Sequence, residues 1–190
     1  MGFAISWIGV RGLPAEEVLA RLGLRRTGAA AAGCDAALTT VATHGGWTIV
    51  FSNEFDPPLF ADGSCERLSA AADVVRVHVE EHVMFAAASF WQGGACRWQV
   101  ERDCQKDFDH LEATGDLPPF FAPIEREQKQ KQQQDEEVDY LFDVPVLLAE
   151  RVTGFRHDQH IEDDFRFAGV EIAAEAPKAA KSLKPWWRVW

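Results

Sequence analysis

The stretch 78–82, HVEEH, carries the residue types of an inverted zinc-protease motif, in which two histidines hold the metal and a glutamate activates water. In a helix, His78 and His82 would share one face about 6 Å apart, close enough to ligate a single zinc ion. In a strand they would lie roughly 13 Å apart with Glu80 between them, too far for two bonds of about 2 Å to one ion. The zinc chemistry therefore depends on a helix at this position.

The pattern around this stretch favours a strand. Valines alternate with polar residues over 74–80, which is the period of a half-exposed strand, and β-branched residues favour a sheet. A helical stripe over 68–86 can also be drawn through the same residues. We interpret the segment as a strand, so that both histidines are ordinary polar residues on the open face of a sheet.

A second group of possible metal ligands lies in RHDQHIEDD, at 156–164. His157, His160 and Asp158 have suitable ligand atoms, and a His-x-x-His pair fits one turn of a helix. The same spacing arises by accident in charged segments, and a solvated acidic surface explains the composition more simply. We therefore predict no metal and no cofactor, with these three residues as the first place to look for a metal.

A third group could act in nucleophilic catalysis. Cys104 lies in the acidic stretch 101–110, and His110 or His44 could serve as its base in a suitable fold. No local residue marks Cys104 as activated, so a half-buried thiol at the exit of a strand is the simpler interpretation. The chain also lacks the nucleophile elbow, the phosphate loop and the dinucleotide fingerprint, so the main ester-hydrolase and nucleotide-binding templates are unsupported.

The elements that position these residues predict an α+β fold. We expect a mostly antiparallel sheet, made of an N-terminal strand and a central meander or hairpin, packed with a few helices. The expected elements are a strand over 3–10, a helix within 15–24 that stops at Gly23, a loop or weak helix over 28–33, a strand within 45–55, a turn region over 56–63, a hairpin within 74–103, a solvated helix or mobile loop over 125–137, and a buried helix within 138–155 capped by Gly154.

The length of 190 residues is most economically one domain. We expect residues 1–170 to form a single α+β domain and residues 171–190 to form a linker and a tryptophan-rich tail. Trp186, Trp187 and Trp190 are the expected partner-binding residues, because tryptophan is favoured at binding hot spots. The tail could fold back into a groove of its own domain, dock on another copy or another protein, or anchor at a membrane interface.

The 30 acidic and 19 basic residues give a formal charge of −11. This charge repels phosphate backbones and would attract a cationic partner in a salt-dependent way, so we expect no nucleic acid. No apolar run is long enough to span a membrane, and the N-terminus does not fit a signal peptide. The wide spacing of the four cysteines predicts reduced, mostly buried thiols in a cytoplasmic protein.

Two functional hypotheses follow. The first, which we favour, is a cytoplasmic binding or regulatory protein without catalysis that presents an acidic surface to a protein partner, for example an inhibitor or immunity protein against a basic toxin. Self-association through the tail is compatible with this hypothesis. The second is a small hydrolase that depends on a metal or on a Cys/His pair.

Overall fold

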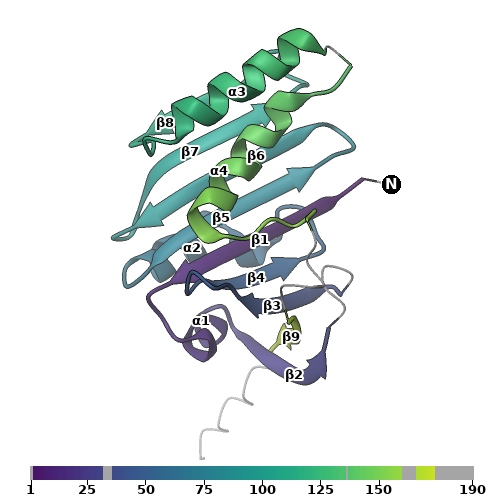
Figure 1. Cartoon of the computed structure of the whole chain (residues 1–190). Helices are drawn as coiled ribbons and strands as arrows, with labels where there is room; N and C mark the ends of the chain where they lie inside the picture. The colour runs from purple at the N-terminus through teal and green to yellow at the C-terminus, as the bar shows by residue number, and fades with distance from the viewer. Residues whose placement is uncertain (1, 32–35, 136, 160–165, 174–190) are drawn as a thin grey trace, which may run out of the picture.

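The computed structural model describes residues 2–31, 36–135, 137–159 and 166–173. Its strands form one antiparallel sheet in the order β2-β9-β3-β4-β1-β5-β6-β7-β8, with helices on both faces (Figure 1). The predicted α+β class with a mostly antiparallel sheet is therefore confirmed. The strands are β1 Ala4–Arg11, β2 Leu24–Ala30, β3 Leu38–Ala42, β4 Thr48–Ser52, β5 Asp73–Glu80, β6 Phe85–Gln92, β7 Ala95–Asp103, β8 Glu112–Gly115 and β9 Ala168–Ile172.

The predicted strands over 3–10 and within 45–55, and the central hairpin, correspond to β1, β4 and the β5-β6-β7 meander. β1 lies between β4 and β5, so the first strand of the chain is near the centre of the sheet. Sequence patterns missed β2, β3, β8 and β9. β2 is an edge strand with six exposed residues out of seven, so it has no alternation to detect.

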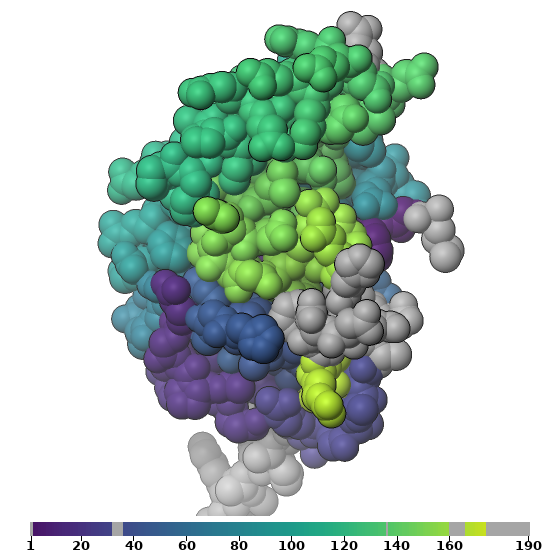
Figure 2. Space-filling view, viewed as in Figure 1, coloured from purple at the N-terminus to yellow at the C-terminus, as the bar shows by residue number. Residues whose placement is uncertain are grey.

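The helices α3 (Phe121–Gln134) and α4 (Asp143–Thr153) cover one face of the sheet, as Figures 1 and 2 show. α4 is the predicted buried helix, and Gly154 ends it in the left-handed conformation at φ 70°. α3 corrects the expectation of a fully solvated polar run, because it buries Gln128 and Gln132 along with Phe121. The Gln132 side chain accepts a hydrogen bond from the backbone N–H of Tyr140, which compensates for the burial of its amide oxygen.

The opposite face of the sheet carries α1 (Ala15–Arg21) and α2 (Asp62–Ser69). The turn region expected over 56–63 contains instead a 3₁₀ turn, η2 (Pro58–Phe60), and the start of α2. α2 has too few apolar residues for a clear helical pattern, although two of its own side chains, Cys65 and Leu68, are buried against the sheet. None of the described helices is long and apolar enough to cross a membrane.

The tryptophans at 47, 91 and 98 are core residues, with at most 6% of each exposed. Trp186, Trp187 and Trp190 lie outside the described residues, so their partner-binding role stays a prediction. The boundary at residue 170 also stays a prediction, and β9 continues to Ile172.

Candidate functional site

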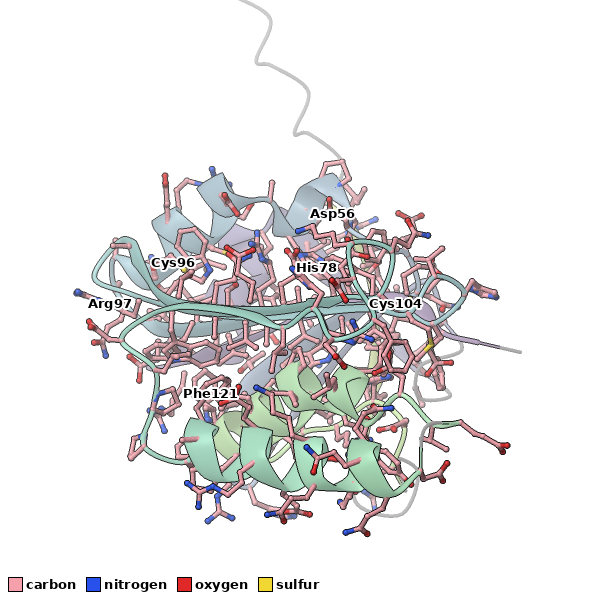
Figure 3. The ribbon with its side chains drawn as sticks, turned by 90° about the horizontal axis from the view of Figure 1, so that it is seen from above. Asp56, His78, Cys96, Arg97, Cys104 and Phe121 are labelled. Carbon is pink, nitrogen blue, oxygen red and sulfur yellow. The ribbon has the colours of Figure 1, made fainter. Side chains whose placement is uncertain are left out.

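The HVEEH stretch is not helical. β5 ends at Glu80, and His82 lies in the turn that follows, where its Nδ1 is 2.7 Å from a carboxylate oxygen of Glu80. His78 points to the face of the sheet that carries α2 and is only 8% exposed. The strand interpretation is thus confirmed for His78, whereas His82 lies beyond the strand. The expected open face is wrong for His78, because α2 and the loop after β4 cover this part of the sheet (Figure 3).

The Cys104 thiol does not contact a histidine. Its Sγ donates to the carbonyl of Val83, while Nδ1 of His110 accepts the backbone N–H of Asp103. His44 lies in the β3–β4 turn, at the end of the sheet away from Cys104. The proposed Cys/His pairs are therefore not assembled by this fold.

The predicted metal residues are engaged in other ways. Both carboxylate oxygens of Asp158 bind the Arg156 guanidinium, at 2.6 and 2.9 Å, and the His157 ring packs edge-on against Phe3. His160 lies outside the described residues. Burial lowers the pKa of His157 to about 4, because the charged imidazolium loses its hydration there.

Within the described residues, Glu101, His110 and Glu112 come close enough to hold an ion. However, Glu101 accepts a 2.6 Å hydrogen bond from Lys106. His110 already uses its Nδ1 lone pair on the Asp103 N–H, which leaves the ring proton of the neutral form on Nε2, the nitrogen that faces Glu112. A metal ligand needs a free lone pair at that nitrogen, so the group is not arranged as a metal site.

The described cysteines only partly follow the expectation of buried thiols. Cys65 is buried, and the loss of hydration raises its pKa to about 11. Cys96 is exposed, like its neighbours Ala95 and Arg97 at the start of β7. Cys104 is partly buried, and Cys34 lies outside the described residues.

One end of the sheet, where β1, β6 and β8 begin, concentrates negative charge. We call this the acidic end and define it as residues 53–57, 81–84, 104–111, 135 and 137–139. These loops contain eight carboxylates against one lysine. The carboxylates are Glu54, Asp56, Glu81, Asp107, Asp109, Asp135, Glu137 and Asp139, and the lysine is Lys106.

The other end of the sheet is nearly uncharged. We call it the neutral end and define it as residues 12–14, 43–47, 70–72, 93–94 and 116–120, with Asp116 as its one acidic residue and no lysine or arginine. Figure 3 shows the separation, with Cys104 at the acidic end and Arg97, beside the neutral end, on the far side of the molecule. The charge asymmetry thus runs along the strands.

The acidic end also exposes large apolar side chains. Phe55, Val83, Phe108 and Val138 are between 38% and 58% exposed there, whereas no large apolar residue of the neutral end is exposed. Phe3, just outside the definition at the start of β1, adds a fifth. Acidic side chains around solvent-facing aromatic and aliphatic groups are typical of a surface that binds other molecules.

A buried arginine holds the acidic end in place. Arg102 is 1% exposed, and all five of its N–H groups have acceptors. Two groups bind the carboxylate of Asp139, at 3.2 and 2.8 Å, and the others bind the carbonyls of Asp107, Phe108 and His110. One side chain therefore fixes the loop after β7 against the segment that leads into α4.

Beside the acidic end, Ser6, His78 and Asp56 form a chain of polar contacts. Ser6 Oγ accepts the backbone N–H of Asp56 at 2.9 Å and lies 2.8 Å from Nδ1 of His78. Nε2 of His78 is 3.8 Å from an oxygen of the Asp56 carboxylate. The residue types match a Ser-His-Asp triad, but Ser6 is completely buried and cannot reach a substrate. We infer that these three polar contacts position the loop after β4.

His78 and Asp56 of this group also line a pocket of about 540 Å³ on the α2 face of the sheet. The small side chains of Ala87 and Ser89 on β6 leave space at its floor, and its lining also includes Phe55, Phe85 and Glu101. Burial is the main cause that lowers the pKa of His78 to about 4, and the nearby Arg76 guanidinium lowers it further. His78 is therefore neutral at pH 7.

Sequence reasoning missed this pocket because its residues come from the loop after β4, α2, β5, β6 and β7. One signal was present for Arg102, since the alternation that places Trp98 and Val100 on the inner face also places Arg102 there. Comparison with protein-family models, curated proteins and solved structures finds no match for the chain.

Proposed function

We propose that the protein is a non-catalytic binding or regulatory protein that presents its acidic end to a basic protein partner. The observation that carries the proposal is that the eight carboxylates and the exposed side chains of Phe55, Val83, Phe108 and Val138 share the same loops. Buried apolar contacts supply most of the affinity in such interfaces, and surrounding charges supply specificity and fast association. A partner with a basic surface and an apolar centre fits both features.

The charges at this end are available to a partner because few are neutralised within the chain. Lys106 is paired with Glu101, and Arg102 with Asp139, but Glu54, Asp107 and Asp109 are exposed. Attraction between these carboxylates and a basic protein is screened by salt, so the complex should weaken as ionic strength rises. An inhibitor or immunity protein against a basic toxin remains one concrete form of this function.

The hydrolase hypothesis receives less support from the geometry. The Cys104 thiol bonds to a carbonyl rather than to a histidine, and Ser6 has no access to solvent. Free thiols at Cys65, Cys96 and Cys104 are consistent with a cytoplasmic location for the proposed binding protein. The tryptophan tail at 186–190 would add a second contact with the partner or with another copy of the chain.

The test uses substitutions that remove charge but keep the loops intact. Asp107 and Asp135 each accept a backbone N–H two residues ahead, which an asparagine oxygen can also do. A triple variant with Asp107→Asn, Asp109→Asn and Asp135→Asn therefore removes three charges from the acidic end. The matched control removes three charges elsewhere, through Glu17→Gln, Glu66→Gln and Asp116→Asn.

Each protein is immobilised and used to capture proteins from native lysate at low and high salt, with quantification by mass spectrometry. We expect the wild type and the control to recover the same basic protein at low salt, and the acidic-end variant to recover about tenfold less, because three interfacial charges contribute roughly 1.4 kcal/mol together. Equal recovery by both triple variants, or recovery of the protein alone, would contradict the proposal.

A further inference from the structure

Two polar groups that line the 540 Å³ pocket, Nε2 of His78 and the carboxylate of Asp56, have unused hydrogen-bonding capacity. Ser6 Oγ accepts the Asp56 N–H, and Nδ1 of His78 is its other polar contact among the described residues. The proton of this buried hydroxyl needs an acceptor, and Nδ1 is the one within reach, so the proton of the neutral imidazole is assigned to Nε2. Nε2 has no hydrogen-bond partner among the described residues, although His78 is more than nine-tenths buried. The nearest acceptor, an oxygen of Asp56, is 3.8 Å away, beyond hydrogen-bond range.

We propose that this pocket binds an aromatic primary carboxamide, or a planar group that likewise presents an N–H donor and a carbonyl acceptor side by side. The carbonyl oxygen would accept the Nε2–H of His78, and the amide N–H would donate to the Asp56 carboxylate. The 3.8 Å contact between Nε2 of His78 and the Asp56 carboxylate, which is too long for a hydrogen bond, would thereby be replaced by two hydrogen bonds to the ligand. The pocket shares Phe55 and Asp56 with the acidic end, but the ligand proposal does not depend on the proposed protein-binding function.

The walls of the pocket suit an aromatic ring. Phe55 meets Phe85 and the His78 ring edge-on, with centroid distances of 5.6 and 6.0 Å, and Phe55 is 40% exposed. A planar ligand can cover this exposed ring while it lies over the small side chains of Ala87 and Ser89. The volume is in the range of small-molecule sites, which run to roughly 300–1,000 Å³.

The pattern of hydrogen-bond donors and acceptors argues against an ionic ligand. Arg76 is paired with Asp62, and Glu101 with Lys106, both at 2.6 Å, so these charges are largely neutralised. A guanidinium or ammonium group has only donors and would oppose the Nε2–H of His78. A carboxylate has only acceptors and would be repelled by Asp56. A neutral group with one donor beside one acceptor satisfies both atoms.

Four probes with the same ring separate these possibilities: benzamide, benzamidine, benzoate and N,N-dimethylbenzamide. Each is titrated into the unmodified full chain, and the backbone amide signals of Phe55, Asp56 and Ser89 are followed by NMR. We expect saturable shifts with benzamide, at roughly millimolar affinity for so small a ligand, and at least tenfold weaker binding of the other three. No saturable shift with benzamide, or equal or tighter binding of any other probe, would overturn the proposal.

A pair of variants tests the role of the carboxylate. Asp56 has φ 45°, so Asp56→Gly is accommodated without strain and keeps the backbone N–H that donates to Ser6. We expect it to lose at least tenfold in benzamide affinity, while Glu54→Gly on the same loop keeps it. Equal loss in both variants would contradict the role of Asp56. The probe series decides the proposal even if the glycine variants disturb the loop.

Discussion

The two ends of the sheet close their loops by different chemistry. At the neutral end short turns rely on glycine. Beside it, at the last residue of β8, Gly115 has φ 84°, and an added Cβ would lie 2.1 Å from the carbonyl oxygen of Arg97. At the acidic end longer loops are closed by side chains, including the carboxylates of Asp107 and Asp135 and the guanidinium of Arg102. Glycine turns leave little for a partner to recognise, whereas side-chain closure leaves charges and aromatic rings at the surface. This contrast supports the proposal that the acidic end, rather than the neutral end, is the binding surface.

Among the changes that test this comparison, replacement of Arg102 should produce the largest loss of stability. Arg102→Ala leaves the Asp139 carboxylate, which is only 13% exposed, and three carbonyls without their donor. We expect a loss of about 3–5 kcal/mol in the free energy of unfolding, measured by urea denaturation.

Arg97→Ala is the matched control, because Arg97 is exposed near the neutral end and bonds one carbonyl. It should change stability by no more than about 0.5 kcal/mol. If Arg102→Ala costs no more than this control, Arg102 does not hold the acidic end together.

Glycines at and beside the neutral end give the next largest effect on stability. Gly115→Ala must place a Cβ against the Arg97 backbone in a left-handed conformation, so we expect a loss of at least about 2 kcal/mol in unfolding free energy. Gly46 also has a positive φ, of 76°, but nothing lies within 4 Å of its added Cβ. Gly46→Ala should therefore lose only about 1 kcal/mol, and equal losses in the two variants would show that the close approach at Gly115 is unimportant.

The smallest of these effects concerns acid sensitivity near the acidic end. His78 and His157 have pKa values of about 4 in the folded chain, against 6.5 for an ordinary histidine. Between these values the unfolded chain binds more protons, so stability is full above pH 6.5 and falls as the pH drops toward 4. We expect a loss of roughly 1 kcal/mol per histidine by about pH 5.5, measured by urea denaturation.

The substitutions His78→Gln and His157→Gln should each remove about half of this histidine-dependent loss. His44→Gln, at an exposed position of the neutral end, provides the control for the general effect of pH on the carboxylates. A wild-type pH dependence in both buried-site variants would contradict the assignment of acid sensitivity to this part of the molecule.

Local patterns predicted the parts of the fold whose periodicity is strong. The valine alternation of β5 and the αL glycine after α4 depend on neighbouring residues alone, so both were readable from the sequence. β9 was missed because its five residues follow a charged segment and show no alternation. The tryptophan tail and its role stay predictions, because those residues lie outside the described part of the chain.

The candidate site was harder to predict, because its contacts span the whole chain. Ser6 and His78 are opposite one another only through the β1–β5 register, and Asp56 joins them through a loop with a positive φ. The charge of −11 indicated an acidic surface but not where on the molecule it would lie. That placement follows from strand direction, which brings loops distant in sequence to the same end of the sheet.

The position of β9 determines when the sheet can be completed during synthesis of the chain. β9 lies between β2 and β3, although these strands precede it by well over a hundred residues. Until residue 172 leaves the ribosome, β3 keeps an open edge and β2 has no neighbour in the sheet. Nascent chains that stall before this point would expose unpaired backbone to other polypeptides. Pairing with β9, the last described strand, therefore protects β2 and β3 from aggregation.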